Sequence, residues 1–153
     1  MNRRDAIRLS EAEQQQFLEE RRTIVLSTLD PRGYPHSVAM WYVMDGGCCW
    51  MTTYAKSQKV ANVRRNPRVA LLAECGETYD TLKGVLIRGH AQLIADDEDR
   101  CVDVLTRVHR KMLGAMPPGI EEALKLQARK RVVIKVTPVR VSSWDHSKLG
   151  GTY

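Results

Sequence analysis

Six stretches of the chain carry the alternating or continuous apolar pattern that is typical of β-strands. They cover residues 23–29, 36–44, 48–53, 68–74, 82–95 and 131–143. Turn signals separate the first three, namely Asp30-Pro31-Arg32-Gly33 and Asp45-Gly46-Gly47. Gly84 and Gly89 lie inside the longest stretch, where glycines commonly mark bulges at a barrel corner. The pattern predicts a mainly β protein with short helices, a six-stranded antiparallel barrel.

Four further segments carry helix signals. Ser10 and Glu13 form a capping box that opens a helix over residues 10–20. A basic helix is expected after Ser57, and Asn66-Pro67 must end it. Four acidic residues at 96–99 open a third helix, whose apolar stripe is predicted to pack in the core. A fourth is expected at 120–130, and the polar, glycine-rich tail 144–153 is expected outside the core.

Length and composition favour a single domain over residues 1–153. A chain of this length buries roughly 70% of its unfolded surface, so it can form a core without metal or disulfide. No apolar run approaches the ~20 residues of a membrane helix, and the N-terminus lacks the apolar stretch of a signal peptide. We therefore expect a cytoplasmic protein with no metal site. The four cysteines, Cys48, Cys49, Cys75 and Cys101, lack metal-ligand spacing and are expected to be reduced, buried thiols.

The chain is basic, with 24 Lys and Arg against 18 Asp and Glu and a net charge of +6. This balance suits either a nucleic acid or a polyanionic small molecule. Helix-turn-helix and RNA-binding motifs are lacking, and a single Phe offers little stacking surface. The expected partner is therefore a small molecule, not nucleic acid or membrane. A basic nucleic-acid-binding barrel is the less favoured alternative.

The stretch 50–72 carries the strongest candidate for chemistry. Thr52 and Thr53 end a strand, Lys56 and Ser57 occupy the following turn, and Lys59 lies at the start of the basic helix. The first turn of a helix presents unpaired N–H groups, which together with hydroxyls and ammonium groups favour a bound anion such as phosphate. An ordinary capped surface helix would show the same spacing.

The order of these elements resembles the split-barrel flavin-binding family typified by pyridoxamine 5′-phosphate oxidase. The resemblance rests on the turn at 30–35, the strand ending in Thr52-Thr53 and the stretch SQKVANVRRNPRVAL at 57–71. It implies a split β-barrel and a homodimer with FMN, or its deazaflavin analogue F420, at the subunit interface. It further implies that residues 37–41 lie beside the ring, with Thr52 and Thr53 near the ribityl chain. The implied cofactor-binding set is Ser37, Val38, Ala39, Met40, Trp41, Thr52, Thr53, Lys56, Ser57, Gln58, Lys59 and Arg65, with Ser57, Gln58 and Lys59 on the phosphate.

The chain departs from the oxidase at its C-terminus, which reads WDHSKLGGTY where the oxidase carries an Arg-rich substrate clamp. The resemblance therefore favours the F420-using branch and hydride transfer to a small electron-poor organic substrate. The basic residues Lys56, Arg64 and Arg65 would suit the tail of F420. An oxidase-type FMN enzyme and a non-catalytic flavin carrier or sensor remain alternatives.

Catalytic side chains are not identified by the sequence, because a flavin or deazaflavin supplies the reactivity itself. Asp145-His146 beside Ser147 does not predict a hydrolase triad, since a nucleophile elbow is lacking. A substrate-binding or lid role is instead open to four residues near the C-terminal tail and the loop before 82, namely Tyr79, Trp144, His146 and Lys148. The alternative for the tail is a swapped or simple surface segment.

Overall fold

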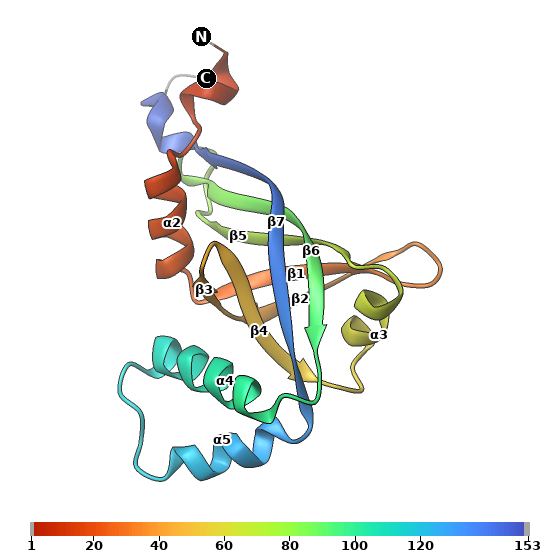
Figure 1. Cartoon of the computed structure of the whole chain (residues 1–153). Coiled ribbons are helices and arrows are strands. Elements are labelled where there is room, and N and C mark those ends of the chain that lie inside the picture. The colour runs from red at the N-terminus through yellow and green to blue at the C-terminus, as the bar shows by residue number, and fades with distance from the viewer. Residues whose placement is uncertain (1, 152–153) are drawn as a thin grey trace.

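The structure, a computed structural model, describes residues 2–151 and builds them around one curled antiparallel sheet (Figure 1). The strands are β1 (Thr23–Leu29), β2 (Pro35–Trp41), β3 (Val43–Asp45), β4 (Cys48–Tyr54), β5 (Arg68–Cys75), β6 (Lys83–Ile94) and β7 (Arg131–Asp145). Their spatial order is β2-β1-β5-β6-β7-β4-β3. The mainly β class and the antiparallel half-barrel are therefore confirmed.

The prediction of six strands was wrong, because residues 36–44 form two strands. β2 pairs with β1, whereas β3 pairs with β4, and only Tyr42 separates them. Since β2 and β3 are the two outermost strands, the sheet must curl until its edges approach each other. Tyr42 is fully buried at this corner and donates a hydrogen bond of 2.5 Å to the Leu18 carbonyl. We call the line where β2 approaches β4 the seam.

Short helices cover the ends and one side of the half-barrel. They are α1 (Arg3–Ala6), α2 (Glu11–Glu20), α3 (Gln58–Arg65), α4 (Glu98–Leu113) and α5 (Ile120–Ala128), with 3₁₀ turns η1 (Tyr79–Thr81) and η2 (His146–Leu149). The predicted capping box opens α2, because the Ser10 hydroxyl and the Glu13 carboxylate each accept from the other residue's N–H. Asn66 follows α3, as predicted, whereas α1 was not predicted.

Two apolar clusters hold these elements together. The larger fills the half-barrel with side chains from α2 and the sheet, including Phe17, Ile24 and Leu71. The smaller joins α4 and α5 to β3 and β7 and includes Leu105 and Val108 of the predicted stripe. The predicted stripe consists of Val102, Leu105, Val108 and Met112. Leu105 and Val108 pack in the core, whereas Val102 and Met112 are only half-buried.

A bulge shapes the outer surface of the sheet, as the internal glycine predicted. Arg88 pairs with Arg140 while Gly89 pairs with Pro138, so Val139 is the extra residue and stands 67% exposed. A Cβ atom on Gly89 would lie 2.6 Å from the Thr137 carbonyl oxygen. Only glycine permits this close approach of the two strands.

Two expectations about burial need correction. The tail was expected outside the core from residue 144, yet β7 continues to Asp145, which is only 8% exposed. The Asp145 carboxylate forms an ion pair with Lys83 and accepts a hydrogen bond from the Ser147 hydroxyl. Asp145 is satisfied by these partners, which is why a charged residue tolerates burial there. All four cysteines are free, but only Cys49 and Cys101 are buried, because Cys48 and Cys75 end strands.

Over residues 2–151, no helix has the length and apolar character needed to cross a membrane. The same part of the chain holds no group of three His, Cys, Asp or Glu side chains that could bind a metal ion.

Candidate functional site

A cavity of about 370 Å³ opens at the seam, between β2 and β4. The start of α3, the middle of α4, the end of α5 and the start of β7 complete its wall. Its lining residues are Ala39, Met40, Trp41, Thr52, Thr53, Tyr54, Lys59, Leu105, Val108, His109, Gln127 and Arg131. The seam cavity thus brings together six residues of the predicted cofactor site, from three separate elements: Ala39, Met40, Trp41, Thr52, Thr53 and Lys59.

The start of α3 carries an unsatisfied hydroxyl beside this cavity. Ser57 is the N-cap residue of the helix, yet its side chain makes no capping hydrogen bond. Its Oγ atom is buried and has no partner among the described residues. Buried hydroxyls are normally hydrogen-bonded, so this one is available to an incoming acceptor. Lys56, in the preceding turn, is exposed.

Two cations line the cavity without a carboxylate to balance them. Burial lowers the pKa of the Lys59 ammonium below its usual 10.5, and the positive charge of Arg131 lowers it further. Within the described part of the chain, no Asp or Glu lines the seam cavity. Like charges held together in this way repel each other, and a bound anion would relieve the repulsion.

Arg131 is fixed in place by its neighbours. Its Nη1 donates to the backbone carbonyl and to the hydroxyl of Thr52, each at 3.4 Å, and its guanidinium carbon lies 4.5 Å from the centroid of the Tyr54 ring. The Nε atom, however, is buried without a partner among residues 2–151. A guanidinium stacked on an aromatic ring, with an N–H still unsatisfied, is suited to binding phosphate or carboxylate.

His109 faces the same cavity from α4. Its Nδ1 lies 2.8 Å from the Leu105 carbonyl, and its ring meets Trp41 edge-on with 5.6 Å between the ring centroids. Because a carbonyl oxygen only accepts hydrogen bonds, Nδ1 carries a proton, and in the neutral ring Nε2 is an acceptor.

Besides Lys56 and Ser57, four residues of the predicted cofactor site do not line the cavity. Ser37 lies further along β2, where its hydroxyl is 2.8 Å from that of Ser27, and Val38 is the neighbouring half-buried residue. Gln58 donates to the Asn62 side chain at 2.8 Å. Arg65 lies at the far end of α3 and donates to the Leu29 carbonyl, so its guanidinium points away from Lys59.

The predicted lid residues lie at the other end of the half-barrel, near the chain ends (Figure 1). The His146 and Tyr79 rings are in contact with centroids 4.5 Å apart, and Trp144 packs over Gly84. Lys148 bonds Glu13 at 2.8 Å and the Arg8 carbonyl at 3.0 Å. Within one protomer these residues do not meet the seam cavity, and their role as a lid stays a prediction.

Sequence reasoning missed Arg131 and His109. Arg131 begins the last strand and reaches the site because Tyr54 pairs with it across β4 and β7. A basic residue at the start of the last strand was a usable signal for an anion site. The sequence does not show, however, that this strand pairs with β4. His109 lies four residues after Leu105 and so shares the same face of α4. A histidine at this spacing from the apolar stripe was a usable signal that it faces the interior.

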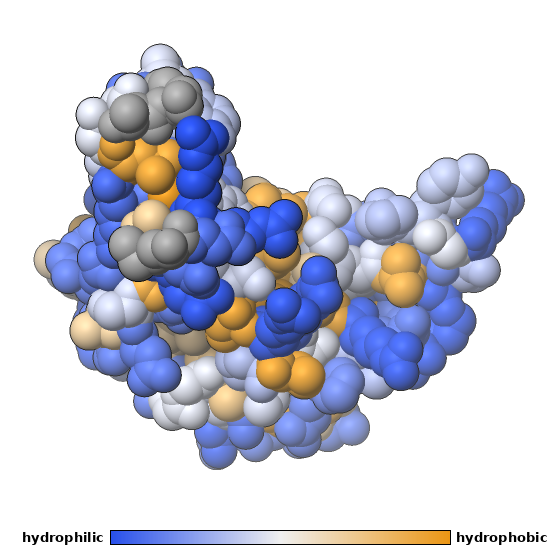
Figure 2. All heavy atoms as spheres, turned by 90° about the horizontal axis from the view of Figure 1, so that it is seen from above, coloured by the Kyte–Doolittle hydropathy of each residue, from blue (hydrophilic) through white to orange (hydrophobic). Residues whose placement is uncertain are grey.

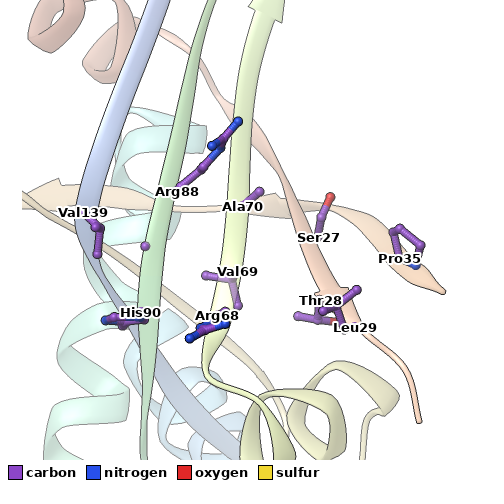
Figure 3. Close-up of a pocket in the computed structure, with 11 residues that line it drawn as sticks. Ser27, Thr28, Leu29, Pro35, Arg68, Val69, Ala70, Arg88, His90 and Val139 are labelled. Carbon is purple, nitrogen blue, oxygen red and sulfur yellow. The ribbon is translucent and has the colours of Figure 1, made fainter. Parts of the chain in front are cut away.

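A second cavity, of about 470 Å³, lies on the outer surface of β1, β5 and β6. Figure 3 shows Arg68 and His90 side by side at one end of it, with Val139 on one flank and Pro35 on the other. Its wall is mainly apolar, and its charged lining groups are Arg68 and Arg88.

The curled sheet defines a split-barrel protein with a cavity between its edges that is lined by two cations, Lys59 and Arg131. The family model described as pyridoxamine 5′-phosphate oxidase matches residues 10–145. The chain belongs to that family, whose split-barrel members include flavin-binding proteins. Among curated proteins, none matches the chain.

Solved structures agree with this assignment. Rv2991, a conserved hypothetical protein from Mycobacterium tuberculosis, is 38% identical with a TM-score of 0.90, and the match covers 100% of this chain and 95% of that one. An F420 reductase is 25% identical with a TM-score of 0.67, over 88% and 98% of the two chains. An FAD-binding protein from Mesorhizobium loti shares the fold, at 19% identity, a TM-score of 0.63 and coverages of 88% and 92%.

Proposed function

We propose that the chain is an oxidoreductase that binds F420 or FMN in the seam cavity and transfers hydride between it and a small electron-poor organic substrate. The observation that carries the proposal is the pair of cations, Lys59 and Arg131, facing one cavity with no carboxylate beside them. The unsatisfied Ser57 hydroxyl and Arg131 Nε add two hydrogen-bond donors. A cofactor phosphate would satisfy both donors and both charges.

The rest of the cavity suits a planar ring. β2 is an outermost strand, so one row of its backbone N–H and C=O groups lacks a partner strand. These groups can hydrogen-bond the amide-like edge of a flavin or deazaflavin. Leu105 and Val108 exclude water from the other side of the cavity. The bound ring would supply the hydride chemistry, while the chain orients it and tunes it by hydrogen bonds.

F420 is the favoured cofactor, with FMN as the alternative. The F420 reductase that is similar along 88% of this chain supports this choice, and so does Lys56, an exposed cation in the turn that precedes Ser57 and Lys59. An extended anionic tail leaving the seam cavity could pass this residue. FMN lacks such a tail and would leave Lys56 without a role.

A homodimer is part of the same proposal. Ala39, Val25, Leu72 and Leu86 form a row across the outer surface of four neighbouring strands, and Val25, Leu72 and Leu86 are only half-buried. Seen from above, apolar side chains lie between the chain ends and the β1–β2 hairpin (Figure 2). Strands that are apolar on both faces are normally covered on both. A second copy would cover this face and complete the seam cavity, whose volume is small for an organic cofactor.

The test is turnover. Reduced F420 and reduced FMN are supplied separately under anaerobic conditions with a panel of quinone, nitroaromatic and enone acceptors, and cofactor oxidation is followed by absorbance. We expect protein-dependent oxidation by at least one acceptor. Tight binding with no oxidation by any acceptor would instead identify a carrier.

A further inference from the structure

Lys111 lies in the wall of a separate cavity on the other side of α4. This cavity has a volume of about 360 Å³ and lies between the end of α2, β3 and α4. Its lining residues are Glu19, Val43, Met44, Arg107, Arg110 and Lys111.

The Lys111 amine is held in a defined position. Its Nζ lies 3.8 Å from the centroid of the Tyr42 ring and donates to the Leu18 carbonyl at 3.2 Å. Tyr42 donates to the same carbonyl, so donors from α4 and from the junction of β2 and β3 meet at one oxygen atom of α2. Among residues 2–151, no carboxylate forms an ion pair with Lys111.

The surroundings of the amine disfavour its charged form. Burial lowers the pKa of Lys111 from 10.5 to about 8, although Cys49 on β4 and Glu19 on α2 act in the opposite direction. Burial also raises the pKa of the Cys49 thiol, which keeps it neutral. At pH 8 about half of the Lys111 amine is therefore neutral and nucleophilic, on the order of 100-fold more than for an ordinary lysine.

An unpaired guanidinium lines the same cavity as this amine. Arg107 is engaged by Asp45 at 3.1 Å and Asp103 at 3.9 Å. Arg110 makes no side-chain hydrogen bond or ion pair within residues 2–151. A free guanidinium next to a nucleophilic amine can bind the phosphate of an incoming reagent.

We propose that Lys111 is an acylation site that accepts its acyl group from an acyl phosphate, with Arg110 binding the phosphate. The amine lone pair attacks the carbonyl carbon, and a C–N bond forms. The C–O bond to phosphate breaks, and inorganic phosphate departs with the electron pair. The amine proton passes to solvent. The resulting amide carries no charge, so it loses the cation–π contact with Tyr42 and loosens the end of α2.

Site-resolved acetylation tests this proposal. The full-length protein is incubated with acetyl phosphate at pH 8, and each lysine is followed by peptide mass spectrometry. We expect Lys111 to react on the order of 10-fold faster than Lys125, which is exposed on α5. Lys111→Arg should remove this fast-reacting site and leave the labelling of Lys125 unchanged.

Two variants isolate the role of the arginine. Arg110→Ala should reduce the preference for Lys111 with acetyl phosphate to the level seen with neutral acetic anhydride, which needs no phosphate site. Arg129→Ala removes an exposed arginine elsewhere and should change neither preference. Acetylation of Lys111 no faster than that of Lys125 would overturn the proposal. So would an unchanged preference for Lys111 in Arg110→Ala with acetyl phosphate.

Discussion

In the proposed function, individual side chains at the seam determine whether an anion binds there. The contribution of Arg131 is the clearest to test by substitution. Arg131→Met keeps much of the apolar stem but removes the charge and the unsatisfied Nε. The loss of a charge-assisted hydrogen bond costs about 1.5–3 kcal/mol, so we expect cofactor affinity to fall roughly 10- to 100-fold. Calorimetry with F420 measures this. Arg129→Met removes a guanidinium that is 67% exposed and serves as the control, expected to bind normally.

A second prediction at this scale concerns acid stability. The hydrogen bond from Lys148 lowers the pKa of Glu13 from 4.5 to about 2, helped by the Ser10 backbone. A carboxylate with a depressed pKa stabilises the folded state above its unfolded pKa, and this contribution is lost as pH falls from about 4.5 to 2.

Urea unfolding across this pH range should therefore show a weaker pH dependence in Glu13→Gln than in the wild type. Glu11→Gln, in the same helical turn, is the control. The effect is expected to be small because Glu13 is exposed to solvent. Identical pH dependence in wild type and Glu13→Gln would show that the Lys148 contact does not persist in solution.

Sequence reasoning grouped residues correctly in space where they are near neighbours in the chain. Thr52, Thr53 and Lys59 lie within eight positions of one another, and they do share one cavity. Arg131 is brought to the site by strand pairing with Tyr54, about half of the chain away in sequence. Tyr79 and His146 do meet each other, but at the opposite end of the half-barrel from Lys59.

At the scale of elements, α3 is positioned by one buried amide. Asn62 is fully buried, donates to the Thr28 hydroxyl at 3.0 Å and accepts from Gln58 at 2.8 Å. Asn62→Ala leaves the buried Thr28 without this partner, so we expect a loss of about 1–3 kcal/mol in the free energy of unfolding. Chemical denaturation measures this. Ala61→Ser, on the exposed side of the same helix, should leave stability nearly unchanged.

Cofactor affinity should fall with the same substitution, because α3 carries both Ser57 and Lys59. An Asn62→Ala variant with wild-type stability would contradict the role given to this amide.

Most elements were predictable because their hydrophobic periods and turn residues are local. An important exception is the break at Tyr42, which local pattern cannot reveal. The sequence pattern of residues 36–44 predicts one strand. In the structure this segment pairs first with β1 and then, after Tyr42, with β4. Only the closure of the whole sheet requires this change of partner.

At the scale of the whole molecule, the proposed dimer gives a further prediction. Leu72→Arg places a charge in the middle of the apolar row on the outer surface of the sheet. Sedimentation velocity should show a dimer for the wild type and a monomer for the variant, with weaker cofactor binding in the monomer. Leu126→Arg, on a side chain of α5 that is 63% exposed, should remain dimeric. A monomeric wild type would refute this part of the account.

The most direct test of the central claim is a calorimetric titration of F420 and of FMN, separately, into the wild-type protein and into Lys59→Ala. We predict saturable binding with F420 favoured, and a loss of about 10-fold or more in affinity in Lys59→Ala, with Lys125→Ala unchanged. Absence of binding for both cofactors, or equal affinity in the wild type and Lys59→Ala, would contradict the assignment of the seam cavity as the cofactor site.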